Sequence, residues 1–236
     1  MERLQNLIAR AGVASRRGAA ELVESGAVTV DGVVVRESGA RFGDDAVIRV
    51  HGRRIAAEGR KRTIVLNKPV GVLSTMSDPF GGETVAELVR TSERLVPVGR
   101  LDRDSEGLLL MSNDGDLVNK LTHPRFEHRK TYIVKTAGRW NDEKLAILRS
   151  PLTLDDGYTI RPVPVEVLQA RPDNTQLLKF ILKEGRKRQI RKMCSAAHLV
   201  VLSLRRVAIG DFELPEDLAP GRWRDLSVDE IAALFR

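Results

Sequence analysis

The chain has 236 residues, 42% of them hydrophobic, and a formal net charge of +7 with a pI near 9.8. This length and apolar content exclude wholesale disorder and fit one sizeable domain together with a smaller one. Cys194 is the single cysteine, which excludes an internal disulfide and a cysteine-rich zinc site. No apolar run approaches membrane-spanning length, and residues 1–4 do not begin a signal peptide. We therefore expect a soluble, cytoplasmic protein.

Two helices and a hairpin are predicted at the amino-terminal end. Apolar residues at helical spacing predict a helix over residues 4–11. Ser15 is a suitable N-cap for a second helix that ends near Gly26. Two β-branched runs flank Asp31 and Gly32, a strong hairpin signal. The expected strands are residues 28–30, 33–35 and 46–50.

A short charged segment, residues 56–62, is expected to link two domains, which we place at residues 1–58 and 63–236. Residues 1–62 hold 12 Lys and Arg against 8 Asp and Glu, so more than half of the net charge lies there. After the linker, strands and helices alternate irregularly, which is typical of an α+β domain with a largely antiparallel sheet. The predicted strands are 63–66, 108–112, 131–135, 176–182 and 200–204, and the predicted helices are 85–90, 116–121, 141–149 and 188–197.

Arginines gather at the turn between the two amino-terminal helices. A solvated face is the ordinary interpretation of Arg10, Arg16 and Arg17 on a small helical unit. However, the order helix, helix, hairpin and the runs 3–17 and 26–32 closely resemble the S4 RNA-binding domain. That resemblance implies RNA binding by this domain, through Arg3, Arg10, Ser15, Arg16 and Arg17.

A second basic cluster holds five Lys and Arg within residues 186–192. The residues Ile190, Met193, Cys194 and Ala197 share one apolar face if the segment is helical. An ordinary amphipathic helix with a solvated basic face would show the same pattern. Five neighbouring cations repel one another unless anions lie close by. A phosphate backbone, or the carboxylate of Asp102, would meet that need.

Asp102 lies between Arg100 and Arg103, just before an apolar run that predicts a buried strand. If the segment were extended, Asp102, Asp104 and Glu106 would share one side, as in a Mg²⁺ site. The two arginines disfavour a cation there. A glycosidase would need a second, distinct acid, and no other carboxylate stands out. A single nucleophilic carboxylate fits better, and such a group needs an arginine partner because desolvation alone raises a carboxyl pKa.

Four motifs follow one another along the chain: residues 66–71, 99–110, 130–132 and 185–191. Together they resemble the signature of the ribosomal RNA pseudouridine synthases of the RsuA/RluB type. Members of that family carry an S4 domain ahead of the catalytic domain, so the resemblance covers essentially the whole chain. It implies an α+β fold, with the S4 domain at residues 1–58 and a pseudouridine synthase domain at 63–236.

The resemblance implies a role for each matching residue. Asp102 corresponds to the catalytic aspartate, Tyr132 to the tyrosine that stacks on the target uracil and takes part in removing its C5 proton, and Arg191 to the arginine that pairs with the aspartate. Arg100 corresponds to a position that enters the space left by the flipped base. Further substrate-binding positions are Lys68, Arg186, Lys187, Arg188 and Ile190.

The implied reaction converts a specific uridine of ribosomal RNA to pseudouridine, and we expect large-subunit rather than small-subunit RNA. No cofactor and no metal are expected, because the isomerisation needs neither redox chemistry nor hydrolysis. The target base must leave its stack to reach Asp102. The expected partner is ribosomal RNA or a ribosome-assembly precursor, bound by a monomer with no obligate protein partner. The alternative is a non-catalytic S4-type RNA-binding or ribosome-assembly protein, which the intact set Asp102, Tyr132 and Arg191 disfavours.

Overall fold

The computed structural model describes residues 1–43, 45–55, 61–154 and 157–236. The chain divides into two units, each described here by itself. Unit 1 comprises Met1–Arg62 with the short segments Thr91–Leu95 and Ser112–Gly115, and unit 2 comprises the remainder. Residues 56–60 of the predicted linker lie outside the described residues, so the domain bounds 1–58 and 63–236 stay a prediction.

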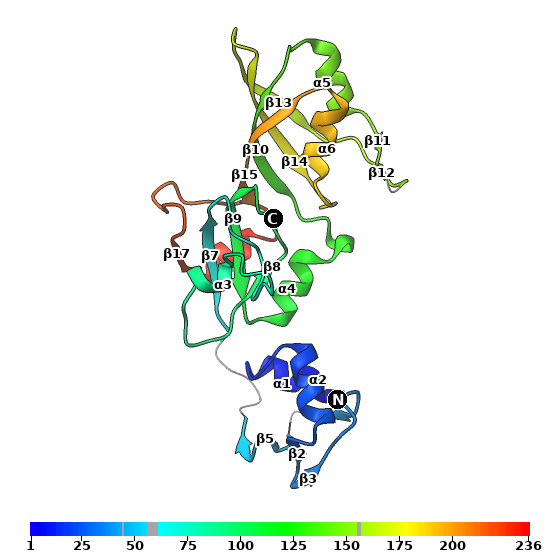
Figure 1. Cartoon of the computed structure of the whole chain (residues 1–236), viewed down its shortest axis with the longest axis vertical. Coiled ribbons are helices and arrows are strands. Elements are labelled where there is room, and N and C mark those ends of the chain that lie inside the picture. The colour runs from blue at the N-terminus through cyan, green and yellow to red at the C-terminus, as the bar shows by residue number, and fades with distance from the viewer. Residues whose placement is uncertain (44, 56–60, 155–156) are drawn as a thin grey trace. The chain divides into compact units, whose positions relative to one another are not determined.

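Unit 1 contains the two predicted helices and the predicted hairpin (Figure 1). Ser15 caps the second helix, because its Oγ accepts a hydrogen bond from the Gly18 amide at 3.0 Å. Asp31 and Gly32 both have positive φ, as a tight hairpin turn requires. The elements are α1 (Leu4–Arg10), α2 (Arg16–Glu24), β1 (Glu2–Arg3) paired with β4 (Arg41–Phe42), and a sheet in the order β3 (Val33–Val34), β2 (Val28–Val30), β5 (Ile48–Val50) and β6 (Arg53–Arg54).

A mixed nine-stranded sheet dominates unit 2 (Figure 1). Its main path is β13 (Val165–Ala170), β14 (Thr175–Leu182), β10 (Lys130–Ala137), β15 (Val200–Ile209), β9 (Glu106–Ser112), β7 (Thr63–Lys68) and β17 (Trp223–Asp225), with β16 (Phe212–Glu213) on β15 and β8 (Val96–Val98) on β9. Strand β10 is antiparallel to both β14 and β15, whereas β15 and β9 are parallel. The predicted α+β class with a largely antiparallel sheet is confirmed.

Helices cover this sheet where the periodicity predicts them. The remaining elements are α3 (Val85–Leu88), α4 (Gly115–Thr122), the 3₁₀ turn Pro124–Phe126, α5 (Asp142–Arg149), β11 (Leu152–Thr153), β12 (Thr159–Ile160), α6 (Gln189–Ala196) and α7 (Val228–Ala233). Helices α5 and α6 pack against each other and against β13 and β15 respectively (Figure 1). No helix in the described part of the chain is long and apolar enough to cross a membrane.

The sequence prediction missed helix α7, the 3₁₀ turn and six strands of unit 2, namely β8, β11, β12, β13, β16 and β17. Strand β13 is an edge strand with mostly exposed side chains and a register shift, so it lacks a clear apolar alternation. Helix α7 is short, but its signal was present as a capping box between Ser227 and Glu230.

One row of residues crosses three adjacent strands and positions the site described below. Tyr132 on β10 is the register partner of Arg206 on β15, and Arg206 is the partner of Gly107 on β9. Gly107 has φ +100°, and a Cβ there would collide with the backbone oxygen of Arg206. Only glycine therefore lets β9 begin this close to β15. With strands about 4.8 Å apart, the backbones of Tyr132 and Gly107 lie roughly 10 Å from each other.

Candidate active site

Asp102 begins a turn that leads into β9. The Ser105 amide donates to the Asp102 carbonyl at 3.0 Å, and the strand starts only at Glu106. The extended row of Asp102, Asp104 and Glu106 that a metal site required is therefore not formed. No group of three or more His, Cys, Asp or Glu side chains within the described ranges is arranged to hold a metal ion.

Lys68 supports this turn from inside the protein. Its side chain is fully buried, and its Nζ donates to the carbonyl oxygens of Pro69, Asp102 and Ser105 at 3.0, 3.1 and 2.7 Å. Burial lowers the pKa of Lys68 to about 8, against the opposing attraction of Asp102. The substrate-binding role implied for Lys68 does not match this placement, because all three donors of the ammonium are used by backbone carbonyls, two of them in the turn.

A second segment, residues 71–74, holds the turn from the other side. The Gly71 amide donates to the Arg103 carbonyl at 2.7 Å, and Arg103 Nε donates to the Gly71 carbonyl at 3.0 Å. Ser74 Oγ donates to the Leu101 carbonyl at 2.8 Å and accepts from the Leu101 amide at 3.1 Å. Leu101 and Arg103, the residues on either side of Asp102, are therefore fixed by hydrogen bonds. This orients the Asp102 side chain without using its carboxylate.

The carboxylates of Asp104 and Asp102, the two aspartates of the turn, have different hydrogen-bond partners. Arg188 forms a bidentate pair with the Asp104 carboxylate at 2.9 and 3.1 Å, and this hydrogen bonding holds the Asp104 pKa below its usual range. Arg188 Nη1 lies 4.0 Å from Asp102 Oδ2. The Asp102 side chain is 41% exposed, and none of the hydrogen bonds among the described residues involves its carboxylate. An oriented and accessible carboxylate is the form that a nucleophile needs.

Arg191 does not pair with Asp102 in this structure. Its Nη2 donates to the Asp104 carbonyl at 2.7 Å, and its Nε lies 3.3 Å from the Asp104 carboxylate. The expected Arg191–Asp102 pair is thus replaced by a clamp between α6 and Asp104. The reason is geometric, because Asp104 lies two residues further along the turn and faces the beginning of α6.

The other residues of the second basic cluster divide between surface and core. Arg186 lies over the ring of Tyr158 at 3.5 Å, and Lys187 is exposed. Arg188 is the N-cap of α6 and has a positive φ of 54°. Ile190, for which substrate binding was implied, is buried in the apolar face of α6. The predicted apolar face of this helix is confirmed, since Met193, Cys194 and Ala197 are buried with it.

Tyr132 and Arg206 lie on the sheet strands next to the start of β9. Tyr132 is 8% exposed, and its register partner Arg206 is buried and donates from Nε to the Leu108 carbonyl at 2.8 Å. Arg206 Nη2 is buried without a hydrogen-bond partner among the described residues. Burial and Arg206 together lower the pKa of Lys130 to about 8. The sequence prediction missed Arg206, whose only local signal is a charged residue within a strand-like run.

The expected RNA-binding residues of unit 1 occupy the ends of its helices. Arg3, Arg16 and Arg17 are exposed, whereas Arg10 donates to Glu2 at 2.7 Å. Ser15 serves as the cap of α2. Arg100, in unit 2, is exposed two residues before Asp102.

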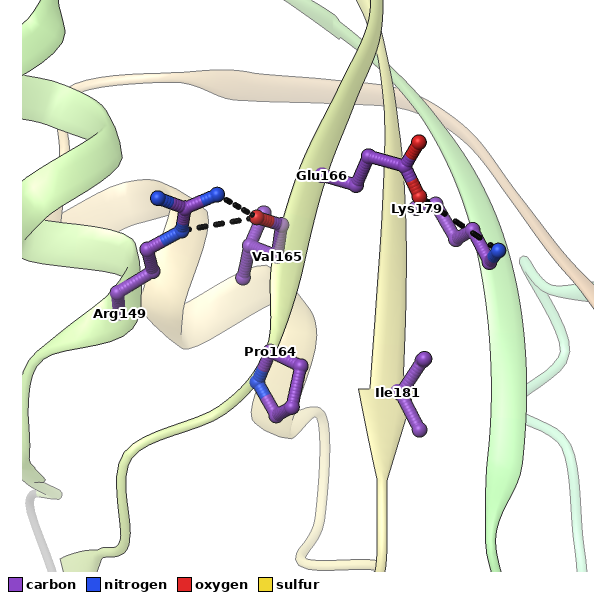
Figure 2. Close-up of a pocket in the computed structure, with 6 residues that line it drawn as sticks. All are labelled: Arg149, Pro164, Val165, Glu166, Lys179 and Ile181. Carbon is purple, nitrogen blue, oxygen red and sulfur yellow. Dashed lines mark hydrogen bonds and ion pairs between the residues drawn. The ribbon is translucent and has the colours of Figure 1, made fainter.

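A separate cavity of about 370 Å³ lies beside β13 and β14 (Figure 2). Arg149 donates from Nε and Nη2 to the Val165 carbonyl, and Glu166 lies 3.5 Å from Lys179. Its charged side chains are thus partnered by other residues of the lining. None of the predicted site residues lines this cavity.

Comparison with known proteins identifies the family of the chain. Residues 62–196 match the family model described as RNA pseudouridylate synthase, and residues 2–48 match the S4 domain. The chain is 38% identical to the ribosomal large subunit pseudouridine synthase B of Bacillus subtilis, over 99% of this chain and 96% of that protein. It is 37% identical to an RNA pseudouridine synthase of Aquifex aeolicus, over 99% and 94% respectively.

A solved structure extends this similarity to the fold. A crystal structure of a pseudouridylate synthase matches with a TM-score of 0.71 at 26% identity, covering 99% of this chain and 100% of that one. The chain therefore belongs to the RNA pseudouridine synthase family, as its motifs indicate. The chain thus combines a region that matches the S4 domain, residues 2–48, with a region that matches the RNA pseudouridylate synthase family, residues 62–196.

Proposed function

We propose that this enzyme isomerises a specific uridine of large-subunit ribosomal RNA to pseudouridine, with Asp102 as the nucleophile. The observation that carries the proposal is the state of the Asp102 carboxylate. Both residues beside Asp102 are hydrogen-bonded to residues 71–74, and the Asp102 carbonyl is held by Lys68. The Asp102 carboxylate accepts no hydrogen bond from a described residue, while the Asp104 carboxylate is hydrogen-bonded to Arg188 and lies 3.3 Å from Arg191 Nε. Relatives named large subunit pseudouridine synthases support the choice of RNA.

The proposed chemistry balances without a co-reactant. The C1′–N1 bond of the target uridine breaks, and its electron pair passes to the uracil. The base turns, its C5 bonds to C1′ and loses its proton, and N1 gains a proton. Asp102 supplies the carboxylate that attacks the nucleoside, Tyr132 lies against the uracil and takes part in removing the C5 proton, and a rotation of Arg191 from Asp104 would bring it to Asp102. The order of these steps does not change the residues required.

RNA binding must offset the cost of extruding the base, a few kcal/mol. Exposed cations are available in both units, namely Arg3, Arg16 and Arg17 in unit 1 and Arg100, Arg186 and Lys187 in unit 2. Their contacts would be to phosphates, which position the RNA without reading its sequence. We expect the enzyme to act as a monomer in the cytoplasm on ribosomal RNA or an assembly precursor. Sedimentation and cell fractionation would test those two points.

The test uses transcripts of large-subunit ribosomal RNA labelled with [5-³H]uridine. We expect the wild type and the control D229N, on α7, to release tritium, and D102N to release none while binding the RNA with unchanged affinity. Loss of the pseudouridine from ribosomal RNA of cells that lack the gene would identify the site. If the wild type binds RNA but releases no tritium from large- or small-subunit RNA or their precursors, the non-catalytic alternative replaces this proposal.

A further inference from the structure

The segment that ties down Asp102 continues into a closed loop with an aromatic tip. The loop closes on itself at its base, where the Leu73 amide donates to the Glu83 carbonyl at 2.8 Å and the Val85 amide donates to the Leu73 carbonyl at 2.9 Å. At the tip, Asp78 accepts from the Gly81 amide through its carbonyl at 3.3 Å and from the Gly82 amide through its carboxylate at 2.8 Å. The turn at the tip therefore satisfies its own backbone groups.

Phe80 lies in that turn and is 93% exposed, more than any other large hydrophobic side chain in the described part of the chain. Single exposed apolar residues are common, but this one is presented by an ordered turn. Its neighbours along the loop are Pro79, Gly81, Gly82 and Glu83, which add no second large apolar side chain to this turn. A lone planar ring in such a setting suits stacking on one flat partner.

The loop is attached directly to the catalytic turn. Ser74 exchanges two hydrogen bonds with Leu101, the residue before Asp102. Phe80 is six positions after Ser74, so its Cα lies within about 20 Å of that attachment point. The exposed guanidinium-bearing residues Arg100 and Arg103 flank Asp102 and would hold phosphates of the same RNA strand.

We propose that Phe80 stacks on an unpaired base flanking the target uridine, and so binds substrate RNA outside the reaction pocket. The proposal rests on the RNA substrate proposed above. When the uridine leaves its stack, the neighbouring base loses a stacking partner, and an aromatic ring at the edge of the site replaces that partner. Unpaired bases in RNA are commonly recognised in this way.

The test compares F80A, F80L and F80W on large-subunit ribosomal RNA transcripts. One stacked base contributes about 1–3 kcal/mol, so F80A should bind the RNA about 5- to 140-fold more weakly. F80W should bind at least as tightly as the wild type, and F80L should resemble F80A, because leucine has no flat π-face. Single-turnover tritium release at limiting RNA should fall in F80A and F80L in proportion to their weaker binding, and should stay at the wild-type level in F80W. F80W adds an indole to Trp140 and Trp223, and its extra fluorescence should be quenched by bound RNA.

The binding measurements test the stacking role of Phe80, and tritium release from the wild type tests the proposed reaction, so the two can fail independently. Wild-type affinity in F80A, or an F80W indole that RNA does not quench, would overturn the stacking role even if tritium release proceeds normally. An F80L variant that binds like the wild type would indicate an apolar contact instead and would also overturn it. Absence of tritium release from the wild type contradicts the proposed reaction, whereas the binding measurements still decide the role of Phe80.

Discussion

In unit 1, Arg3, Arg16 and Arg17 are exposed and form no ion pair with a described residue, whereas on α6 of unit 2 the guanidinium groups of Arg188 and Arg191 are bonded to Asp104. The two clusters look alike as sequence, since each is a short run rich in arginine. They differ in whether the fold provides an internal anion. Arginines of the first kind are available to RNA phosphates, and those of the second kind hold the catalytic turn against α6. Net charge alone does not distinguish these roles.

Among variants of the two arginine clusters, the largest effect on RNA binding is expected in unit 1. Replacing both Arg16 and Arg17 by alanine should weaken RNA binding and lower the slope of log affinity against log salt by about 1.4–1.8, because each phosphate contact contributes about 0.7–0.9. Filter binding of ribosomal RNA over a series of KCl concentrations measures that slope. The matched control is R161A, which removes an exposed arginine already paired with Glu127. An unchanged slope in the double variant would mean that unit 1 does not contact phosphates.

A smaller effect, of opposite sign, is expected from D104N. Without the Asp104 charge, Arg188 loses its ion pair, whereas Arg191 keeps its hydrogen bond to the Asp104 backbone carbonyl, so the same salt titration should steepen by up to about 1. Turnover should fall at the same time, because the clamp between the turn and α6 is weakened. The control E127Q releases Arg161 on a different part of the surface. If D104N changes neither the salt slope of RNA binding nor the turnover, pairing with Asp104 does not account for the difference between the arginines of unit 1 and those of unit 2.

The smallest effect is on stability and depends on pH. Arg188 lowers the Asp104 pKa in the folded protein, so this pair stabilises the fold above the unfolded-state value of about 3.9 and the contribution is lost as pH falls below it. Because both side chains are partly exposed, D104N should cost at most about 1 kcal/mol at pH 7. Urea unfolding at pH 7 and pH 3 should show this difference shrinking at the lower pH. A difference that grows on acidification would contradict the pairing.

Local chemistry in the sequence was enough to predict much of the molecule. The Ser15 cap, the Asp31-Gly32 hairpin and the apolar face of α6 depend on contacts a few residues apart, and the structure confirms them. The motif around Asp102 likewise indicates the family from the sequence alone. These features are readable because helix period and turn geometry act over short distances along the chain.

Only the tertiary structure determined which charged side chains pair with one another. Arg188 and Arg191 lie 84 and 87 positions from Asp104, and sheet register together with the placement of α6 brings them to that aspartate rather than to Asp102. The same holds for Lys68, which is enclosed beneath the turn 34 positions away, and for the exposure of Phe80. Ion pairing changes within a few ångströms, so it follows from the packing of distant segments and not from the pattern of residues along any one of them.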